Sequence, residues 1–429
     1  MDLSTAHTAP ASPSTASAAD VRTDGARLWQ SLMDLAQIGA TPKGGVCRLA
    51  LTDLDRQGRD LFVQWAKDAG CTLRVDAIGN IFARRAGSDD SLPPVMTGSH
   101  IDTQPTGGKF DGNYGVLAGI EVLRTLNARG IRTRAPLEVA VWTNEEGSRF
   151  VPVMMGSGVF AQAFTLEHAL AQKDAAGVSV AEALQAIGYN GPAGPAAHPV
   201  GAYFEAHIEQ GPVLEKHEKV IGVVQAALGQ RWYDVTITGM EAHAGPTPME
   251  MRQDALLAAS DLIAAVNRIA TDRKPHGRGT VGQLGVYPNS RNVIPGSVSM
   301  TVDLRAPDDA MLSDMDAALQ AVCAEIGAAR KVGIQVQQVV YFPPQPFTPT
   351  LVASIRQHAA ALGYSAMDVV SGAGHDAVYV ARLAPTAMIF VPCDNGISHN
   401  EIENADPAHL EAGCNVLLHA MLDAAGVAA

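Results

Sequence analysis

The chain is poor in aromatic and basic residues and has no long apolar run. Lys and Arg total 31 against 44 Asp and Glu, which gives a formal net charge of −13. Because nucleic acids and anionic membranes attract clustered basic side chains, this deficit argues against both as partners. A small-molecule ligand or another protein chain is expected instead. The length of 429 residues predicts more than one domain.

Other absences bear on the cellular compartment. The five cysteines are scattered and lack CxxC spacing, which favours reduced thiols over a disulfide framework. No apolar run reaches the roughly 18 residues needed to span a bilayer. The first residues are rich in Ala, Ser, Thr and Pro and lack the apolar stretch of a signal peptide. We therefore expect a soluble cytoplasmic protein with a disordered tail over residues 1–24.

Short apolar runs alternate with helical stretches over residues 25–228 and resume over 344–429. This pattern is typical of an α/β domain with a central sheet. Polar residues follow three of these runs, at 95–97, 137–142 and 203–204. Because ligands in open α/β sheets bind at the carboxyl ends of strands, these polar residues should meet in one cleft.

Residues 229–343 show a different order of predicted helices and strands. Their order βαββαβ predicts a ferredoxin-like domain inserted into the first. Residues 298–305 alternate cleanly between apolar and polar side chains, as a half-buried strand does. The proline-rich stretch at 342–346 predicts a stiff linker back to the first domain.

Two adjacent carboxylates, Glu145 and Glu146, follow the run at 137–142. Successive strand residues point to opposite sides, so the two should have different roles. One would face a metal ion, while the other would take a proton from a metal-activated water. Two acids at an exposed strand end are also commonplace, so the pair alone does not predict a site.

His100 and Asp102 form a His-x-Asp pair. One His100 nitrogen would bind a metal ion while Asp102 accepts the hydrogen of the other. Asp111 lies among glycines ahead of a helical run, where a carboxylate can bridge two cations about 3.5–4 Å apart. A turn residue or helix N-cap is the alternative for Asp111.

His207 and His399 complete the candidate set. Each follows an apolar run, and a histidine in such a place, taken alone, is more often structural than a metal ligand. The prediction of a dinuclear metal site therefore depends on the whole set rather than on any single member.

The segments GSHIDT, GGKFDGNYG, WTNEEGSRF, HIEQGP, EAHAGPTP, NVIPG, DLR, GAGHD and GISHNE occur in this order. They resemble the motifs of the hydantoinase/carbamoylase branch of the M20-type metallopeptidases, over nearly the whole chain. That branch includes N-carbamoyl-L-amino acid hydrolases, β-ureidopropionases and allantoate amidohydrolases.

The resemblance implies two divalent metal ions, with zinc expected and manganese, cobalt or nickel able to replace it. One ion would be bound by His100 and His207 and the other by Glu146 and His399. Asp111 would bridge both ions. Glu145 would act as general base, taking a proton from the bridging water and passing it to the leaving nitrogen.

The resemblance also implies that the inserted domain is a lid and a homodimer interface. His243 would reach across the dimer and stabilise the developing oxyanion in the partner's site, with a plain loop histidine as the alternative. Asn292 and Arg305 would bind the substrate carboxylate. A solvated surface arginine is the alternative for Arg305.

Further substrate contacts are expected from one side chain and one loop. Gln210 would contact the ureido group. The backbone N–H groups of Gly372, Ala373 and Gly374 would help bind the carboxylate. His375 and Asp376 would only order this loop.

The implied reaction is hydrolysis of the carbamoyl C–N bond of an N-carbamoyl-L-amino acid or N-carbamoyl-β-alanine to the amino acid, CO2 and ammonia. Alternatives are an allantoate amidohydrolase, an aminoacylase or dipeptidase, and an inactive ureido-binding homologue. His207 argues against a peptidase, because many peptidase relatives carry a carboxylate there. The presence of every ligand and of Glu145 argues against an inactive chain. Residues 151–155, unusually rich in valine and methionine, would shape a side-chain pocket.

Overall fold

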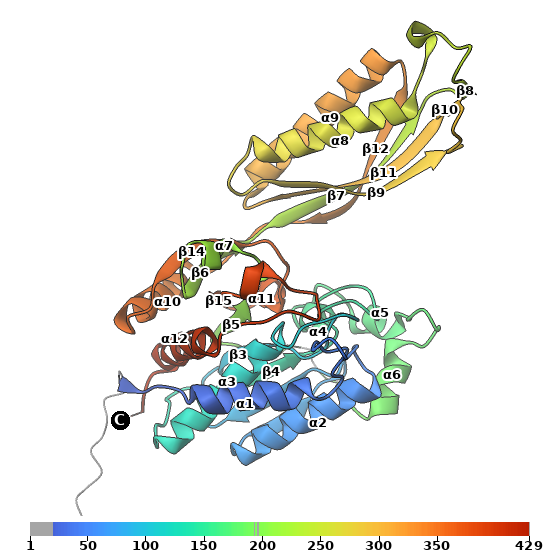
Figure 1. The fold of residues 1–429 in the computed structure, drawn as a ribbon. Coiled ribbons are helices and arrows are strands. Elements are labelled where there is room, and N and C mark those ends of the chain that lie inside the picture. Colours follow the sequence, from blue (N-terminus) through green and yellow to red (C-terminus); the bar gives the residue numbers. More distant parts are fainter. Residues whose placement is uncertain (1–19, 193, 195–196, 429) are drawn as a thin grey trace, which may run out of the picture.

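The computed structural model describes residues 20–192, 194 and 197–428, which form a main body and an inserted domain, each with its own sheet (Figure 1). The chain leaves the main sheet after Ala227 at the end of β6 and returns to it at Gln345 in β13. The predicted mixed α/β fold with a central mixed sheet is confirmed.

The main sheet has the order β1-β2-β4-β3-β5-β15-β6-β13, with β14 also paired to β6. Its centre is parallel, since β3 pairs in parallel with β4 and β5, and β5 with β15. These four strands are buried along their whole length. The strands are β1 Thr72–Val75, β2 Ile81–Arg85, β3 Val95–His100, β4 Leu137–Trp142, β5 Ala202–Ile208, β6 Ile221–Ala227, β13 Gln345–Pro346, β14 Ala366–Ser371 and β15 Thr386–Val391.

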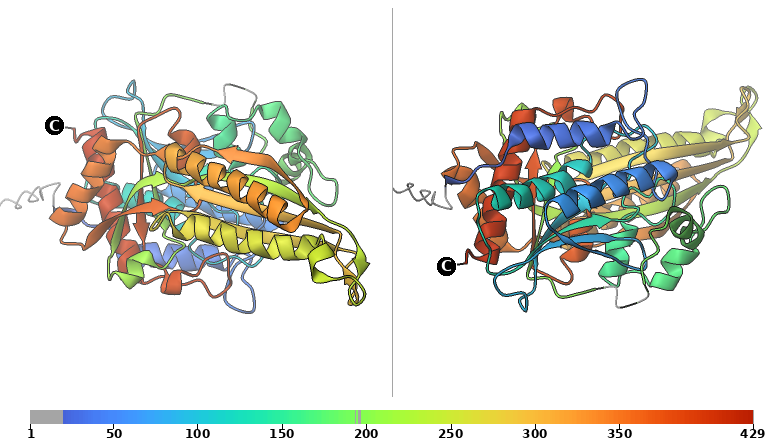
Figure 2. Two further views of the ribbon diagram at one scale, coloured as in Figure 1. Left: turned by 90° about the horizontal axis from the view of Figure 1, so that it is seen from above. Right: turned by 90° about the horizontal axis from the view of Figure 1, so that it is seen from below.

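Helices of the main body pack on this sheet. Helices α1, α3 and α12 contact one another, and α4 and α11 pack together elsewhere against β4, β5 and β15. Figure 2 shows α1, α2 and α3 side by side when the molecule is seen from below. The helices are α1 Gly25–Ala36, α2 Asp53–Asp68, α3 Asn113–Ala128, α4 Met155–Phe160, α5 Leu166–Ala171, α6 Val180–Ile187, α7 Val213–Lys216, α10 Pro349–Ala361, α11 Asp376–Val380 and α12 Pro407–Ala425.

Local capping determines where several helices begin. The Thr52 side chain accepts the N–H of Asp55 at the start of α2. Asp406 caps α12 in the same way and is followed by Pro407, whose missing N–H costs nothing in the first turn. The long helix α3 has buried residues on nearly every side, which suits a helix covered by both the sheet and other helices.

The inserted domain has the predicted βαββαβ order. Its antiparallel sheet runs β12-β7-β11-β9, and helices α8 and α9 cover one face (Figure 2). A short β8–β10 ladder lies at the tip that points away from the main body (Figure 1). The elements are β7 Gly229–Thr238, β8 Ala242–His243, α8 Ala255–Thr271, β9 Arg278–Tyr287, β10 Val293–Ile294, β11 Ser297–Ala306, α9 Asp309–Arg330 and β12 Gly333–Phe342.

The predicted disordered tail, residues 1–24, includes residues 20–24, which are ordered and packed in the structure. Val21 and Thr23 are buried, and the N–H of Thr23 donates to Asn415 Oδ1 at 2.8 Å. Residues 20–24 are therefore packed on α12, because Val21 gains apolar burial there and Thr23 finds a polar partner. Residues 1–19 of the predicted tail lie outside the described part of the chain. Among the described residues no helix is long and apolar enough to cross a bilayer.

Candidate active site

Parallel strands bring the predicted metal ligands to one edge of the main sheet. His100 ends β3, Glu145 and Glu146 follow β4, and His207 lies near the end of β5. His399 comes from the loop after β15, the other parallel neighbour of β5. We predicted that His207 would follow its strand, but β5 extends to Ile208 because its ladder with β15 continues past the polar residue Glu205.

Asp111 lies between two groups of side chains. Its Oδ1 is 3.6 Å from His100 Nε2 and 3.3 Å from His207 Nε2. Its Oδ2 is 3.2 Å from His399 Nε2, which is 3.4 Å from Glu146 Oε2. Burial opposes ionisation of Asp111, but hydrogen bonds from the three histidines hold its pKa well below the usual value. Each group has its ligand atoms within 4.8 Å of one another and could hold a cation.

Backbone carbonyls determine which nitrogen of two histidines faces Asp111. His100 Nδ1 lies 2.9 Å from the Asp102 carbonyl oxygen, and His207 Nδ1 lies 2.9 Å from the Ile208 carbonyl oxygen. A carbonyl only accepts, so both Nδ1 atoms must carry the hydrogen. Each Nε2 therefore lies on the Asp111 side, where it donates to Asp111 when the ring is protonated and offers the lone pair that a metal ligand requires when the ring is neutral.

Asp102 contacts His100 differently from the prediction. Its backbone carbonyl, not its carboxylate, accepts the Nδ1–H, and the carboxylate Oδ1 is 4.0 Å from Nδ1. The carboxylate instead accepts the backbone N–H groups of Glu145 and Glu146, each at 3.2 Å. Asp102 therefore positions the two glutamates, because β3 and β4 are parallel neighbours and the residues that follow them meet at the same sheet edge.

Glu145 is buried and lies next to the first group. Its Oε2 is 3.4 Å from His100 Nε2. Burial raises the pKa of Glu145 well above its usual value, and the carboxylates of Asp376, Glu146 and Asp102 add to the effect. A carboxylate with a raised pKa can hold a proton near neutral pH, which a general base that later acts as an acid must do.

Sequence reasoning missed Glu403, which joins two loops of the site. Its side chain is buried, its Oε1 accepts the N–H groups of Phe110 and Asp111 at 2.9 and 3.2 Å, and its Oε2 is 2.8 Å from the Ser398 hydroxyl. A Cβ on Gly108 would lie 2.0 Å from this carboxylate, so glycine is required there. The sequence signal was one further acid two residues beyond GISHNE, which has no distinctive spacing.

Sequence reasoning also missed Gln104. Its backbone N–H and its Nε2 donate to the two carboxylate oxygens of Glu146 at 3.1 and 2.7 Å, and its Oε1 accepts from Ser148. Glu146 is thereby aimed at His399. Gln104 lies directly in the loop after His100, but a lone glutamine carries no chemical signature in a sequence.

Gly112 allows Asp111 to approach the two histidines closely. Its φ is +66°, a conformation that favours glycine, and a Cβ would lie 2.4 Å from the His100 ring. Its N–H donates to His207 Nε2 at 3.1 Å. Replacing Gly112 would therefore push the loop away from both imidazoles.

A cavity of about 320 Å³ opens over these groups, between the main body and the inserted domain. Arg305 lines it from β11, and Ala373 and Gly374 line it from the loop after β14. Arg305 also bonds to Asp303 at 2.9 Å and donates to the Gly372 carbonyl at 2.9 Å. The structure thus brings Arg305 beside the 372–374 loop, as the expected shared contact with a carboxylate requires.

Gln210 also lines this cavity, in contact with the ligand groups. Its Nε2 donates to Asp111 Oδ2 at 2.8 Å and is 3.3 Å from the Ser398 hydroxyl. His375 and Asp376 lie at the start of α11, where His375 Nε2 is 2.9 Å from the Ser371 hydroxyl and Asp376 bonds to Ser157. The last two residues hold the loop to its surroundings.

Comparison with known proteins identifies the family. Residues 96–423 match the model of Peptidase family M20/M25/M40. The chain is 48% identical over 406 residues to the N-carbamoyl-L-amino-acid amidohydrolase of Rhizobium meliloti, covering 95% of this chain and 98% of that one. The chain belongs to the M20 family. Within it the hydantoinase/carbamoylase branch is confirmed, and so is the prediction of a hydrolase acting on carbon–nitrogen bonds other than peptide bonds.

Two further proteins are similar to the chain over most of its length. The allantoate amidohydrolase of Bacillus subtilis (strain 168) is 35% identical over 389 residues, covering 89% of this chain and 93% of that one. A crystal structure of an amidase of the hydantoinase/carbamoylase family from Burkholderia multivorans has 59% identity and a TM-score of 0.92, covering 94% and 98% of the two chains. Membership of M20, together with two residue groups that could hold a cation, indicates metal dependence.

Two predicted residues of this M20 chain lie in a part of the fold away from the cavity. His243 and Asn292 lie in and beside the β8–β10 ladder, at the tip of the inserted domain away from the main body (Figure 1). The N–H of Ala244 donates to the Asn292 carbonyl at 2.9 Å, and His243 is exposed. Within one chain these two residues neighbour each other, not the ligands.

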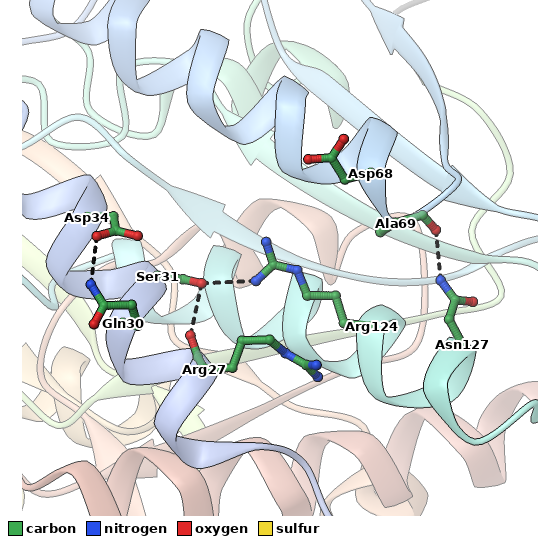
Figure 3. A pocket seen from close by; sticks show the side chains of 8 residues that line it. All are labelled: Arg27, Gln30, Ser31, Asp34, Asp68, Ala69, Arg124 and Asn127. Carbon is green, nitrogen blue, oxygen red and sulfur yellow. Dashed lines mark hydrogen bonds between the residues drawn. The ribbon is translucent and has the colours of Figure 1, made fainter.

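A second hollow of the M20 chain lies between α1, α2 and α3 (Figure 3). Arg124 donates to the Ser31 hydroxyl at 2.9 Å there, and Asn127 donates to the Ala69 carbonyl at 2.8 Å. None of the predicted site residues lines it. Its arginines are offset by Asp34 and Asp68 on the same walls, so it carries no net charge to attract an ion.

Proposed function

We propose that this M20 chain hydrolyses the carbamoyl C–N bond of N-carbamoyl amino acids. The observation that carries the proposal is Asp111, whose two oxygens face separate ligand groups beside the buried carboxylate of Glu145. The names of the relatives support the substrate class.

The ligand groups suit two divalent cations. His100 and His207 would hold one, Glu146 and His399 the other, and Asp111 both. Imidazole and carboxylate ligands without a thiolate fit zinc and also manganese, cobalt or nickel. When bound, such ions polarise a substrate carbonyl and lower the pKa of a water.

The residues around the cations carry the proton transfers. Glu145 takes a proton from the attacking water, whose oxygen then bonds to the carbamoyl carbon. Glu145 next gives this proton to the departing amino nitrogen as the C–N bond breaks. The products are the amino acid and carbamic acid, which decomposes to CO2 and ammonia. The burial that raises the pKa of Glu145 makes it able to retain the proton between the two steps.

The other end of the cavity would orient the substrate. Arg305 presents a planar guanidinium suited to a carboxylate and donates to the Gly372 carbonyl of the loop formed by Gly372, Ala373 and Gly374, whose N–H groups would add to the contact. The N–H of Ala373 would then exchange its bond to Ser371 Oγ for one to the substrate. Gln210, bonded to Asp111, lies where it could contact the ureido group.

We further propose a homodimer through the inserted domain, with His243 and Asn292 completing the partner's site. The position of β8 and β10 at the far tip supports this, because neither residue reaches the ligands of its own chain (Figure 1). Large apolar side chains are exposed on α8 and on the edge strand β9 beside it, which would suit an interface: Leu256, Leu257, Ile263, Leu284 and Tyr287.

Metal removal combined with a base variant tests the proposal. The protein is stripped with a chelator, reloaded with zinc, and assayed on N-carbamoyl-L-amino acids, N-carbamoyl-β-alanine and allantoate. We expect hydrolysis of carbamoyl amino acids only in the reloaded protein. Glu145→Gln should keep its metal content and lose turnover by about a thousandfold or more. Hydrolysis of allantoate alone would replace the proposal by the allantoate reaction.

A further inference from the structure

Valine and methionine side chains crowd the segment after Glu146, and part of this segment lines the cavity. Val153 and Met154 both line it next to the ligand groups. Val153 is 40% exposed, although it is apolar. An exposed apolar side chain at the mouth of a reactive cavity is a candidate ligand contact.

Met154 is held rigidly in this position. Its N–H donates to the Glu145 carbonyl at 2.7 Å, so it moves with the catalytic glutamate. Behind it, Tyr379 and Ala161 pack against it in a small apolar cluster. Its thioether also reaches the 372–374 loop, because a Cβ on Gly374 would lie 3.0 Å from the Met154 methyl carbon. Met154 thus forms a fixed apolar wall between the glutamate and the carboxylate-binding loop.

Trp232 lines the same cavity from the inserted domain. It is the Cα partner of Asp303 across β7 and β11, while Arg305 is paired with Gln230. Side chains two residues apart share a face, so Trp232 and Arg305 are diagonal neighbours on the sheet face opposite α8 and α9. Trp232 is 40% exposed there, whereas the next residue, Tyr233, is buried against the helices.

The polar groups of the cavity are concentrated away from Val153 and Met154. Gln230 lies beside Arg305, and the Gln104 amide is already bonded to Glu146 and Ser148. A second ureido group placed against Met154 or Val153 would lose its hydrogen bonds to water without replacement. An α-carbon without a side chain would leave this apolar wall in contact with water.

We infer that Val153, Met154 and Trp232 bind the substrate's side chain, and that this side chain is apolar. The inference rests on the proposed function. A substrate whose carboxylate contacts Arg305 and whose carbamoyl carbon lies near Glu145 has its α-carbon between them. A side chain on that carbon would then lie in the cavity that all three residues line together with Arg305 and Glu145.

The test compares the metal-loaded wild type on N-carbamoyl derivatives of L-leucine, L-methionine, L-phenylalanine, glycine and β-alanine, and on allantoate. We expect kcat/KM for the three apolar substrates to exceed that for the glycine derivative at least about tenfold, since each buried methylene adds severalfold discrimination. Equal or better use of the glycine or β-alanine derivative would overturn the inference while leaving the proposed function intact. No hydrolysis of any carbamoyl compound by protein with full metal content would overturn the proposed function itself.

Variants separate a side-chain pocket from general damage. Trp232→Ala and Met154→Gln should lower kcat/KM for the apolar substrates about ten- to a hundredfold and for the glycine derivative less than about threefold. Val339→Ala is the matched control, because Val339 is an exposed apolar residue of the same inserted sheet that does not line the cavity. A loss that is equal for all substrates would show that the residues do not contact the side chain.

Discussion

The carboxylate of Asp102 accepts the backbone N–H of Glu145 at 3.2 Å and, through its second oxygen, that of Glu146 at the same distance. One buried side chain thus positions both the proposed base and a proposed metal ligand. Burial raises the pKa of Asp102, while the two N–H groups and His100 oppose this shift.

Asp102→Asn should lower kcat about ten- to a hundredfold, because one backbone N–H would face an amide NH2 instead of an oxygen. KM should change little, since Asp102 does not line the cavity. Steady-state kinetics and metal analysis on the same sample measure both effects. Asp234→Asn, on the exposed face of β7, serves as control. An unchanged kcat in Asp102→Asn would exclude the positioning role.

Metal binding at His399 should weaken as the pH falls. Its bond to Asp111 and the charge of Glu146 raise the pKa of His399 to about 9, against the effect of burial. Only neutral imidazole binds a metal, so at pH 7 a cation must displace a proton from His399. Below pH 9 the affinity of this group should fall by up to about tenfold per pH unit, and above pH 9 it should level off. Calorimetry in buffers of different ionisation enthalpy should show proton release at pH 7 that disappears near pH 10.

For metal binding, the hydrogen bonds of the Glu403 side chain should matter more than its negative charge. The single hydrogen of the Ser398 hydroxyl lies within reach of Glu403 Oε2 at 2.8 Å and Asp111 Oδ2 at 3.1 Å, and it can be donated to only one of them. Burial raises the pKa of Glu403 to about 7, so near neutral pH Glu403 can donate its own proton to Ser398. A glutamine can donate in the same way.

Glu403→Ala should therefore weaken metal binding about ten- to a hundredfold, while Glu403→Gln should stay within a few-fold of wild type. Zinc content after dialysis and the increase of Tm on adding zinc provide two readouts independent of turnover. Equal losses in both variants would mean that the carboxylate charge matters and would contradict the shared-hydrogen arrangement.

Mixing two inactive variants tests whether His243 acts across a dimer. Glu145→Gln and His243→Ala should each be nearly inactive alone. In a co-expressed heterodimer one site would combine an intact Glu145 with the partner's intact His243, so random pairing should restore about a quarter of wild-type activity. Size-exclusion chromatography with light scattering checks that both variants are dimers. Failure of any activity to return would mean that His243 acts in the site of its own chain, and a fully active His243→Ala variant would place it outside the site.

The strands, the helices and the inserted domain could largely be predicted from the sequence, because short-range patterns of apolar and polar residues determine them. Alternation over residues 298–305 predicted β11, and the order of elements predicted the inserted βαββαβ domain. The parallel strands then explain why His100, Glu146 and His207 meet at one sheet edge, since only that edge holds the carboxyl ends of β3, β4 and β5.

Tertiary structure alone decided the contacts between loops that are distant in sequence. No sequence pattern predicts that Glu403 accepts the N–H of Asp111, almost three hundred residues away. None predicts that the Asp102 carboxylate accepts the N–H of Glu145 instead of binding His100. Side-chain chemistry indicates which residues could bind a metal ion or transfer a proton. Which oxygen faces which N–H depends on how the loops after β3, β4 and β15 pack, and that packing is a property of the whole fold.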